Sequence, residues 1–387
     1  MLIIGLMSGT SLDGVTAALA EIEGSSVADL SWQLRGWATV SYGDEQRRRM
    51  HEAIVGGGAA AICALNADLG AWLADAAIRV CETADVPLDQ VALIGSHGQT
   101  IWHIPPAEGR RGSTLQLGDA ATIAERTGCP VISDFRSRDM AAGGHGAPLV
   151  PWVDQALFAL PGEARALQNL GGIGNVTWVP PRDSDRELLA FDTGPANSLI
   201  DAAVHLASGG RLDYDEGGQL AARGSVDESL LADLLRHPFF EQDPPRSTGR
   251  EEFGVPFVQR LVEVVQPEGD RDWLDIIATL TELSARSIAG AYRRWILPRG
   301  VREVVLTGGG ARNRTLVRRI EALLAPVPVL GGEVLGVDPE AKEALAFAVL
   351  AWAYSKGIPA NAPTATGASG PRLLGSFTPA GSVRPWR

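Results

Sequence analysis

The chain has little cysteine and no cysteine pattern that would form a disulfide framework or bind a metal. Among its 387 residues the only cysteines are Cys63, Cys81 and Cys129, and none lies in a Cys-x-x-Cys pattern or beside a histidine. Such spacing excludes the usual disulfide-rich scaffolds and zinc sites. Three scattered thiols are typical of small buried side chains in a reducing compartment.

Positive charge and long hydrophobic runs are also scarce. The 34 Lys and Arg residues are outnumbered by 46 Asp and Glu, which gives a formal net charge of −12. Because a nucleic-acid-binding face needs clustered basic residues, we expect no nucleic-acid partner. The longest membrane-like run, Ala344–Tyr354, is much shorter than the roughly 20 residues of a bilayer span. Met1–Met7 has no basic stretch of the signal-peptide kind. The sequence therefore predicts a cytoplasmic protein with no membrane partner.

Glycine, in contrast, is abundant. The chain has 45 glycines, and they cluster in short motifs. A length of 387 residues favours two domains, each able to bury a core. Glycine in loops lets the backbone approach a ligand closely. We therefore expect two domains with ligand-binding loops.

The most informative motif is Gly5–Thr16, which joins two strand-like runs at Met1–Leu6 and Val15–Ile22. It is typical of a β-hairpin tip whose backbone N–H groups converge on an anion. Asp13 supplies one carboxylate for the Mg²⁺ of a bound nucleotide. The motif has no lysine and no following helix, so it is not a Walker loop. A bare tight hairpin is the alternative. The glycines that would let the backbone approach the anion are Gly5, Gly9 and Gly14, and the hydroxyl donors are Ser8, Thr10 and Ser11.

Two further Gly-rich motifs follow apolar strands, where α/β folds place ligands. Asn169–Asn175 echoes the first hairpin, and its Gly171, Gly172 and Gly174 could hold a second part of the same polyphosphate. Gly308–Gly310 lies between a predicted strand and a predicted helix, where backbone could accept a flat ring or a ribose. An ordinary turn is the alternative for each.

Asp192 is the sharpest single candidate for catalysis. It follows the apolar run Leu188–Phe191 directly, so we expect it at the carboxyl end of a strand. An aspartate there is often only a helix cap. Between two phosphate-type loops, a partly desolvated carboxylate is better interpreted as a general base.

A second polar group follows the predicted strand Val91–Ile94. His97 there is either a structural histidine or a ligand contact, with Gln99 and Thr100 beside it. Further along the chain, Arg136 is either a solvated ion-pair partner or a clamp for a substrate carboxylate. The polar segment Asp134–Pro148 is the predicted connection between domains.

Helical and strand-like patterns alternate along the chain, which predicts an α/β fold with two similar halves. The longest helical pattern is Ala59–Ala84, and the last is about Pro339–Lys356.

The motifs together resemble those of anhydro-N-acetylmuramic acid kinases, and the resemblance spans nearly the whole chain. It implies the two-domain actin-like ATPase fold shared by sugar kinases and Hsp70, with ATP in an interdomain active-site cleft. The expected domains are 1–135, onto which the tail of about 357–387 packs, and 136–356. The segments that carry the resemblance are Gly5–Gly14, Ser96–Thr100, Asp134–Arg136, Gly143–Pro151, Asn169–Asn175, Phe191–Asn197, Thr307–Gly310, Lys342–Ala344 and Thr366–Ala368.

The resemblance also implies a reaction. Water attacks the anomeric carbon of 1,6-anhydro-N-acetylmuramic acid while O6 takes the γ-phosphoryl group of MgATP. The products are N-acetylmuramic acid 6-phosphate and ADP, in the recycling of cell-wall sugars. The anhydro sugar has no O6 proton to remove, so the base must activate water instead.

The roles of individual residues follow from the same resemblance. Asp192 would be the base, Glu343 would orient the water and Asp13 would hold Mg²⁺. Arg136 would bind the substrate carboxylate. The expected ATP contacts are Gly9, Thr10, Ser11, Leu12, Asp13, Gly14, Val15, Thr16, Gly171, Gly172, Gly174, Asn175, Gly308, Gly309 and Gly310. The expected sugar contacts are Ser96, His97, Gln99, Thr100, Asp134, Arg136 and Asn197.

Thr16 departs from the family pattern, which commonly has aspartate there, so one carboxylate near the first hairpin is missing. Three other functions fit parts of the sequence. One is a kinase of another 1,6-anhydro sugar such as levoglucosan, which has no carboxylate for Arg136. The others are a non-catalytic sugar sensor, which we would expect to carry a DNA-binding segment, and an Hsp70-like ATPase, which we would expect to carry a peptide-binding extension. The motifs of the sequence predict neither. A homodimer is one possible oligomeric state.

Overall fold

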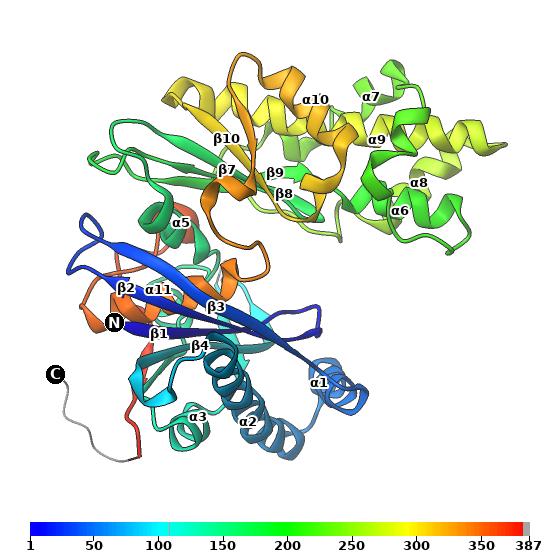
Figure 1. Ribbon diagram of the computed structural model, residues 1–387. Helices are drawn as coiled ribbons and strands as arrows, with labels where there is room; N and C mark the ends of the chain where they lie inside the picture. The colour runs from blue at the N-terminus through cyan, green and yellow to red at the C-terminus, as the bar shows by residue number, and fades with distance from the viewer. Residues whose placement is uncertain (108, 382–387) are drawn as a thin grey trace. The chain divides into compact units, whose positions relative to one another are not determined.

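The computed structural model describes residues 1–107 and 109–381, which form two compact units. The first unit contains Met1–Leu157 and residues 337–381, and the second contains Phe158–Gly336. Residues 382–387, the end of the predicted tail, lie outside the described residues. Each unit has one sheet with helices packed on it (Figure 1).

The sheet of the first unit has the strand order β12-β6-β4-β1-β2-β3, and β5 pairs with β4. Strands β1, β2 and β3 form an antiparallel meander, whereas β4 and β6 run parallel to β1. The strands are β1 (Leu2–Ser8), β2 (Gly14–Glu23), β3 (Ser31–Ser41), β4 (Val91–Ile104), β5 (Ser113–Leu117), β6 (Val131–Ser133) and β12 (Ser376–Thr378).

Helix α2 (Ala59–Ala84) covers one face of this sheet, as the helical pattern predicted. Its buried Leu69 and Leu73 pack with Leu6 and Leu19 in one apolar cluster. Helices α1 (Asp44–Gly56) and α3 (Ala120–Thr127) contact α2. By length and composition α2 could also cross a membrane. This is weak evidence, because core helices of globular proteins meet the same criterion; 39% of its apolar window is buried in the structure.

Helix α11 (Lys342–Ser355) lies against β1, β2 and β4 from the other face. Its approach requires glycine at two facing positions. A Cβ atom on Gly5 would lie 1.8 Å from the Ala344 carbonyl oxygen, and one on Gly95 would lie 2.1 Å from that of Phe347. Gly5 therefore makes room for a helix, and the prediction that it shapes the anion loop is wrong.

The second unit repeats this architecture. Its sheet has the order β11-β10-β7-β8-β9, which matches β6-β4-β1-β2-β3 strand for strand in sequence order and direction. The strands are β7 (Arg165–Leu170), β8 (Ile173–Val179), β9 (Leu189–Pro195), β10 (Glu303–Thr307) and β11 (Val329–Gly331). Two α/β units of one topology confirm the predicted α/β fold with two similar halves.

Helices α9 (Asp270–Ala291) and α10 (Arg314–Leu324) pack in the second unit (Figure 1). Helix α6 (Ser198–Ala207) begins directly after β9 and contacts α8 (Val255–Val265) and α9. The remaining helices are α4 (Ser137–Ala141), α5 (Val150–Phe158), α7 (Glu228–Leu234) and α12 (Pro363–Thr366).

The chain passes between the units at other places than the sequence suggested. The segments 136–157 and 337–356 belong to the first unit, although they were expected in the second. Segment 136–157 is held in the first unit by buried Asp139, whose carboxylate accepts hydrogen bonds from Asn361 Nδ2 (2.7 Å) and Thr366 Oγ1 (2.8 Å) of that unit. An ion pair between Lys342 and Asp154 (2.8 Å) further ties α11 to α5. The predicted connection at Asp134–Pro148 is therefore internal to the first unit.

Candidate functional site

The first hairpin presents an exposed loop on a buried support. Thr10, Ser11 and Asp13 are exposed, and the Leu12 N–H closes the turn on the Gly9 carbonyl (3.2 Å). A Cβ on Gly9 would have no neighbour nearer than 3.7 Å, so the loop is open there. The hydroxyl and carboxylate groups of this loop are therefore accessible to a ligand.

Gly14, Val15 and Thr16 lie in β2 beyond the loop. A Cβ on Gly14 would lie 2.4 Å from the Val40 carbonyl oxygen, so glycine is needed there for the close approach of β3. The Val15 side chain is buried, and the Thr16 hydroxyl lies 2.9 Å from that of Thr39.

Beneath this loop lies a buried network of three side chains. The Ser8 hydroxyl donates to Gln99 Oε1 (2.5 Å) and lies 2.7 Å from the Tyr42 hydroxyl. Burial raises the pKa of Tyr42 to about 12, so this hydroxyl stays protonated at neutral pH. Gln99 is fully buried, and its Nε2 donates to the Thr100 carbonyl (3.1 Å). In this structure Gln99 supports the hairpin from below.

Arg136 is held by His97, the histidine that the sequence left open between two roles. Arg136 Nε and Nη2 lie 3.0 and 2.9 Å from His97 Nε2, and Nη1 donates to the Gly146 carbonyl (2.7 Å). Burial, with the charge of Arg136, lowers the pKa of His97 to about 3. The ring is therefore neutral, with Nδ1 donating to the Gly98 carbonyl (2.8 Å) and Nε2 accepting from the guanidinium. His97 thus orients Arg136.

Other predicted sugar contacts of the first unit lie near this pair in the fold. Burial lowers the pKa of Arg136, and the nearby Glu343 carboxylate, exposed in the first turn of α11, opposes that effect. Asp134 is exposed in a left-handed conformation (φ 55°), and its Oδ1 accepts from Ser137 (2.5 Å). Thr100 Oγ1 accepts from Gln116 (3.2 Å). The buried Ser96 hydroxyl has no hydrogen-bond partner within the described part of the chain.

The Asn169–Asn175 motif forms the β7–β8 hairpin of the second unit, as predicted. The Gly171 carbonyl accepts from the Asn197 N–H (3.0 Å) and Nδ2 (2.7 Å), and that of Gly172 accepts from Ala196 and Ser198 (both 3.0 Å). Because a trans peptide directs its C=O and N–H in opposite directions, the N–H groups of Gly172 and Ile173 point away from the start of α6. This orientation suits anion binding, and Asn197 maintains it.

Asp192 lies within β9, and the prediction that a strand ends before it is wrong, because β9 pairs with β8 as far as Pro195. The segment 246–248 surrounds it. Its Oδ2 accepts from the Thr248 N–H (2.9 Å) and from the Ser247 hydroxyl (3.0 Å). The main chain of Asp192 makes two hydrogen bonds with Arg246. The Asp192 N–H donates to the Arg246 carbonyl (3.1 Å), and Arg246 Nε donates to the Asp192 carbonyl (2.9 Å). No hydrogen bond to Oδ1 occurs within the described residues.

Burial raises the pKa of Asp192, and the hydrogen bonds from Thr248 and Ser247 and the charge of Arg246 oppose the rise. Arg246 is itself buried, with its guanidinium over the rings of Phe239 (4.6 Å) and Trp295 (4.5 Å). A carboxylate with one bonded and one available oxygen and a raised pKa is suited to accept a proton. The segment 246–248 was not predicted as part of the site, although it begins a polar Arg-Ser-Thr-Gly-Arg run over 246–250 that was the available signal.

The Gly308–Gly310 run follows β10 and packs against the hairpin of the same unit. A Cβ on Gly308 would lie 2.4 Å from Asn169 Oδ1, and one on Gly310 would lie 2.5 Å from Asn197 Nδ2. Gly309 is exposed, and a Cβ there would meet nothing within 4 Å. Only Gly309 therefore leaves open backbone that a ring could approach.

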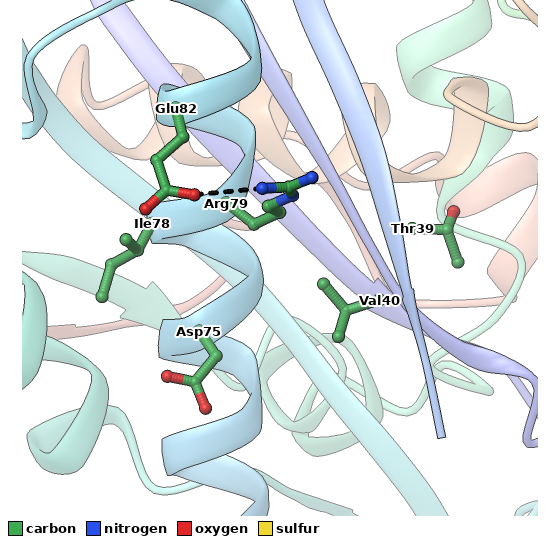
Figure 2. A pocket seen from close by; sticks show the side chains of 6 residues that line it. All are labelled: Thr39, Val40, Asp75, Ile78, Arg79 and Glu82. Carbon is green, nitrogen blue, oxygen red and sulfur yellow. Dashed lines mark hydrogen bonds and ion pairs between the residues drawn. The ribbon is translucent and has the colours of Figure 1, made fainter. Parts of the chain in front are cut away.

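A surface hollow of about 470 Å³ lies elsewhere, between the edge strand β3 and helix α2 (Figure 2). Asp75, Arg79 and Glu82 of α2 line it opposite Thr39 and Val40, and Arg79 pairs with Glu82 at 3.3 Å. None of the predicted site residues lines this hollow, although Thr39 on its wall lies beside Thr16 of the first hairpin.

The family model described as anhydro-N-acetylmuramic acid kinase matches residues 1–380. The chain belongs to the anhydro-N-acetylmuramic acid kinase family. This confirms the family predicted from the motifs.

Individual relatives match over nearly the full length. A protein of Gloeobacter violaceus named anhydro-N-acetylmuramic acid kinase is 47% identical over 98% of this chain and 99% of its own. One of the same name from Caldanaerobacter subterraneus subsp. tengcongensis is 43% identical over 97% of this chain and 96% of its own. The solved activator of the 2-hydroxyisocaproyl-CoA dehydratase from Clostridium difficile with bound ADPNP covers 92% of this chain and 96% of its own. It has 14% identity and a TM-score of 0.44, too low to support an inference.

For an anhydro-N-acetylmuramic acid kinase family member, the residues present suit a nucleotide with Mg²⁺. Within residues 1–107 and 109–381 there is no cluster of three or more metal-ligating side chains that could hold a metal by itself. Mg²⁺ in kinases is usually bound by one or two carboxylates together with the substrate phosphates. The exposed carboxylate of Asp13, beside the open loop at Gly9, suits that arrangement.

Proposed function

We propose that the chain is an ATP-dependent kinase that opens 1,6-anhydro-N-acetylmuramic acid hydrolytically and phosphorylates O6. The products are N-acetylmuramic acid 6-phosphate and ADP, and the physiological use is recycling of cell-wall sugar. The observation that carries the proposal is Asp192, a partly buried carboxylate with Oδ2 bound by Ser247 and Thr248. Family membership supplies the substrate class.

In the proposed mechanism Asp192 Oδ1 takes a proton from water as the water oxygen attacks C1. The C1–O6 bond breaks, and O6 attacks the γ-phosphorus while the bond to ADP breaks. Glu343 orients the water. Bound Mg²⁺, held through Asp13, would neutralise phosphate charge. The hairpin amides of Gly172 and Ile173 and the loop of Gly9 hold the phosphates.

The proposal is tested with purified protein, MgATP and three sugars: 1,6-anhydro-N-acetylmuramic acid, levoglucosan and open-ring N-acetylmuramic acid. We expect phosphorylation of the first, identified by mass. In ¹⁸O-water the label should appear at C1 of the product. Label in the phosphate would instead indicate plain ATP hydrolysis, and turnover of levoglucosan alone would favour the other anhydro-sugar kinase.

The role of Arg136 yields a prediction on sugar selectivity. Arg136→Met removes the guanidinium that His97 orients, so the carboxylate of the substrate loses a charge-assisted partner. We expect KM for 1,6-anhydro-N-acetylmuramic acid to rise about 10–100-fold, since hydrogen bonds to charged groups contribute roughly 1.5–3 kcal/mol. Exposed Arg138, two residues on, provides the matched control as Arg138→Met. Equal KM values for wild type and Arg136→Met would contradict the assignment.

The two hairpins yield a second prediction. Gly9→Val and Gly172→Val should each raise KM for ATP at least about tenfold, because a branched side chain blocks close approach of phosphate to the backbone. A circular-dichroism melt checks that each variant folds. Normal ATP kinetics in both folded variants would rule out these loops as the phosphate site.

A further inference from the structure

Neither phosphate-type hairpin contains a cation. Within Gly5–Thr16 the only charged residue is Asp13, and Asn169–Asn175 has none. Phosphoryl transfer develops charge on the γ-phosphoryl oxygens and the leaving oxygen, and kinases commonly place a Lys or Arg there besides the metal. Arg250 is in a position to meet this need.

Arg250 lies directly on the second hairpin. The place that a Cβ of Gly172 would occupy is 3.1 Å from Arg250 Nε and 3.2 Å from its Nη2. The guanidinium thus packs against the Cα of Gly172, where any larger residue would displace it. Arg250 comes from the loop before α8, far away in sequence.

The Arg250 side chain is exposed and uncommitted. Within the described residues it makes no hydrogen bond and no ion pair. Its charge nevertheless acts on the pKa of Asp201, in the first turn of α6. Burial raises the pKa of Asp201 to about 6, Arg250 opposes the rise, and Asp215 and Asp213 add to it. The guanidinium therefore keeps its five N–H donors for another anion.

The same loop also holds the proposed base. The N–H of Thr248, two residues before Arg250, donates to Asp192 Oδ2 at 2.9 Å. Asp192 in β9 pairs with Asn175 in β8, beyond the glycines of the hairpin. One short segment, 246–250, thus positions the proposed proton acceptor and carries a cation over the proposed phosphate loop.

We propose that Arg250 is a catalytic residue that binds oxygens of the γ-phosphoryl group during its transfer from ATP to O6. The inference rests on the proposed function. Arg250 takes no proton and forms no covalent bond; the water proton goes to Asp192, and the O6–phosphorus bond forms as the bond to ADP breaks. The planar guanidinium can contact two phosphoryl oxygens at once, which an ammonium cannot do in the same geometry.

The test compares Arg250→Ala and Arg250→Lys with Arg260→Ala, an exposed arginine on α8 in the same unit. We expect Arg250→Ala to lower kcat about 10²–10³-fold, the range for loss of one transition-state donor. KM for ATP and for the sugar should change less than about threefold, and Arg260→Ala should match wild type. Arg250→Lys should recover only part of the rate. Since Arg250 has no bonded partner in the described chain, all three should melt like wild type.

A second measurement separates transition-state binding from a structural role. ADP with aluminium fluoride mimics the transition state of phosphoryl transfer. The affinity of the enzyme for this analogue should fall in Arg250→Ala in parallel with kcat. Added guanidinium ion should restore part of the rate of Arg250→Ala. Normal kcat in Arg250→Ala would overturn the inference while leaving the proposed function intact. A raised sugar KM with unchanged kcat would also overturn it, and would assign Arg250 to the substrate carboxylate. No turnover of the anhydro sugar by wild type would mean that the proposed function has failed.

Discussion

Replacing Asp192 with asparagine should lower kcat by roughly 10²–10⁴-fold, or about 3–5 kcal/mol of activation free energy. Asparagine keeps the size of the side chain and can still accept hydrogen bonds from Ser247 and Thr248 through its carbonyl oxygen. It cannot accept the proton of the attacking water. Because that transfer develops only in the transition state, the affinities for sugar and ATP should change little.

The pH profile provides an independent readout of the same group. A general base works only when deprotonated, so kcat/KM of the wild type should rise with pH through the pKa of Asp192. Burial raises that pKa above its ordinary value of 3.8, so the acid limb should lie at higher pH than for an exposed aspartate. The Asp192→Asn variant should lose this limb.

Ser247→Ala is the matched control, because it removes one hydrogen bond to Oδ2 and leaves the carboxylate. With one stabilising contact to the charged form gone, its acid limb should move to still higher pH, while kcat at alkaline pH stays close to wild type. An Asp192→Asn enzyme with near-normal kcat would end the case for this residue as the base.

Gly5→Ala should destabilise the protein by about 3 kcal/mol or more, the largest stability effect that we expect. The new methyl group would overlap the backbone of α11, with the Ala344 carbonyl oxygen 1.8 Å from it. Inserting a methyl group into a packed core typically costs about 1–3 kcal/mol. Here the clash is with backbone, and relief requires α11 to move away from β1. Urea unfolding of the purified variant measures the loss.

Gly9→Ala is the control, since a Cβ there has its nearest neighbour at 3.7 Å. Its free energy of unfolding should stay within about 0.5 kcal/mol of wild type, the usual range for surface changes. If Gly5→Ala were as stable as Gly9→Ala, the close packing of α11 on β1 would be refuted.

Much of the fold was predictable from local pattern. The run Ala59–Ala84 has apolar residues at spacings of three and four, and it forms α2 with the predicted bounds. The two Gly-rich hairpins also form where the sequence predicted them. Such features depend on residues near one another in the chain, so they are encoded where they occur.

The boundaries that failed depend on partners far along the chain. β4 continues through His97 and Thr100 because its far half pairs with β5, and β9 continues through Asp192 because it pairs with β8. A local pattern of polar residues and glycine predicts a loop at both places. Backbone hydrogen bonds to a neighbouring strand outweigh that preference.

The sequence by itself determined the residue types of the proposed site: the hairpin donors, a carboxylate at Asp192 and a cation at Arg136. Only the tertiary structure decided what each group contacts. Three such contacts matter: neutral His97 beside Arg136, the 247–248 segment bound to Asp192, and Arg250 on Gly172. Each joins residues 39 or more positions apart in the sequence. Whether a carboxylate has a raised pKa, or a guanidinium has donors to spare, depends on burial and on those partners, and spacing along the chain does not encode them.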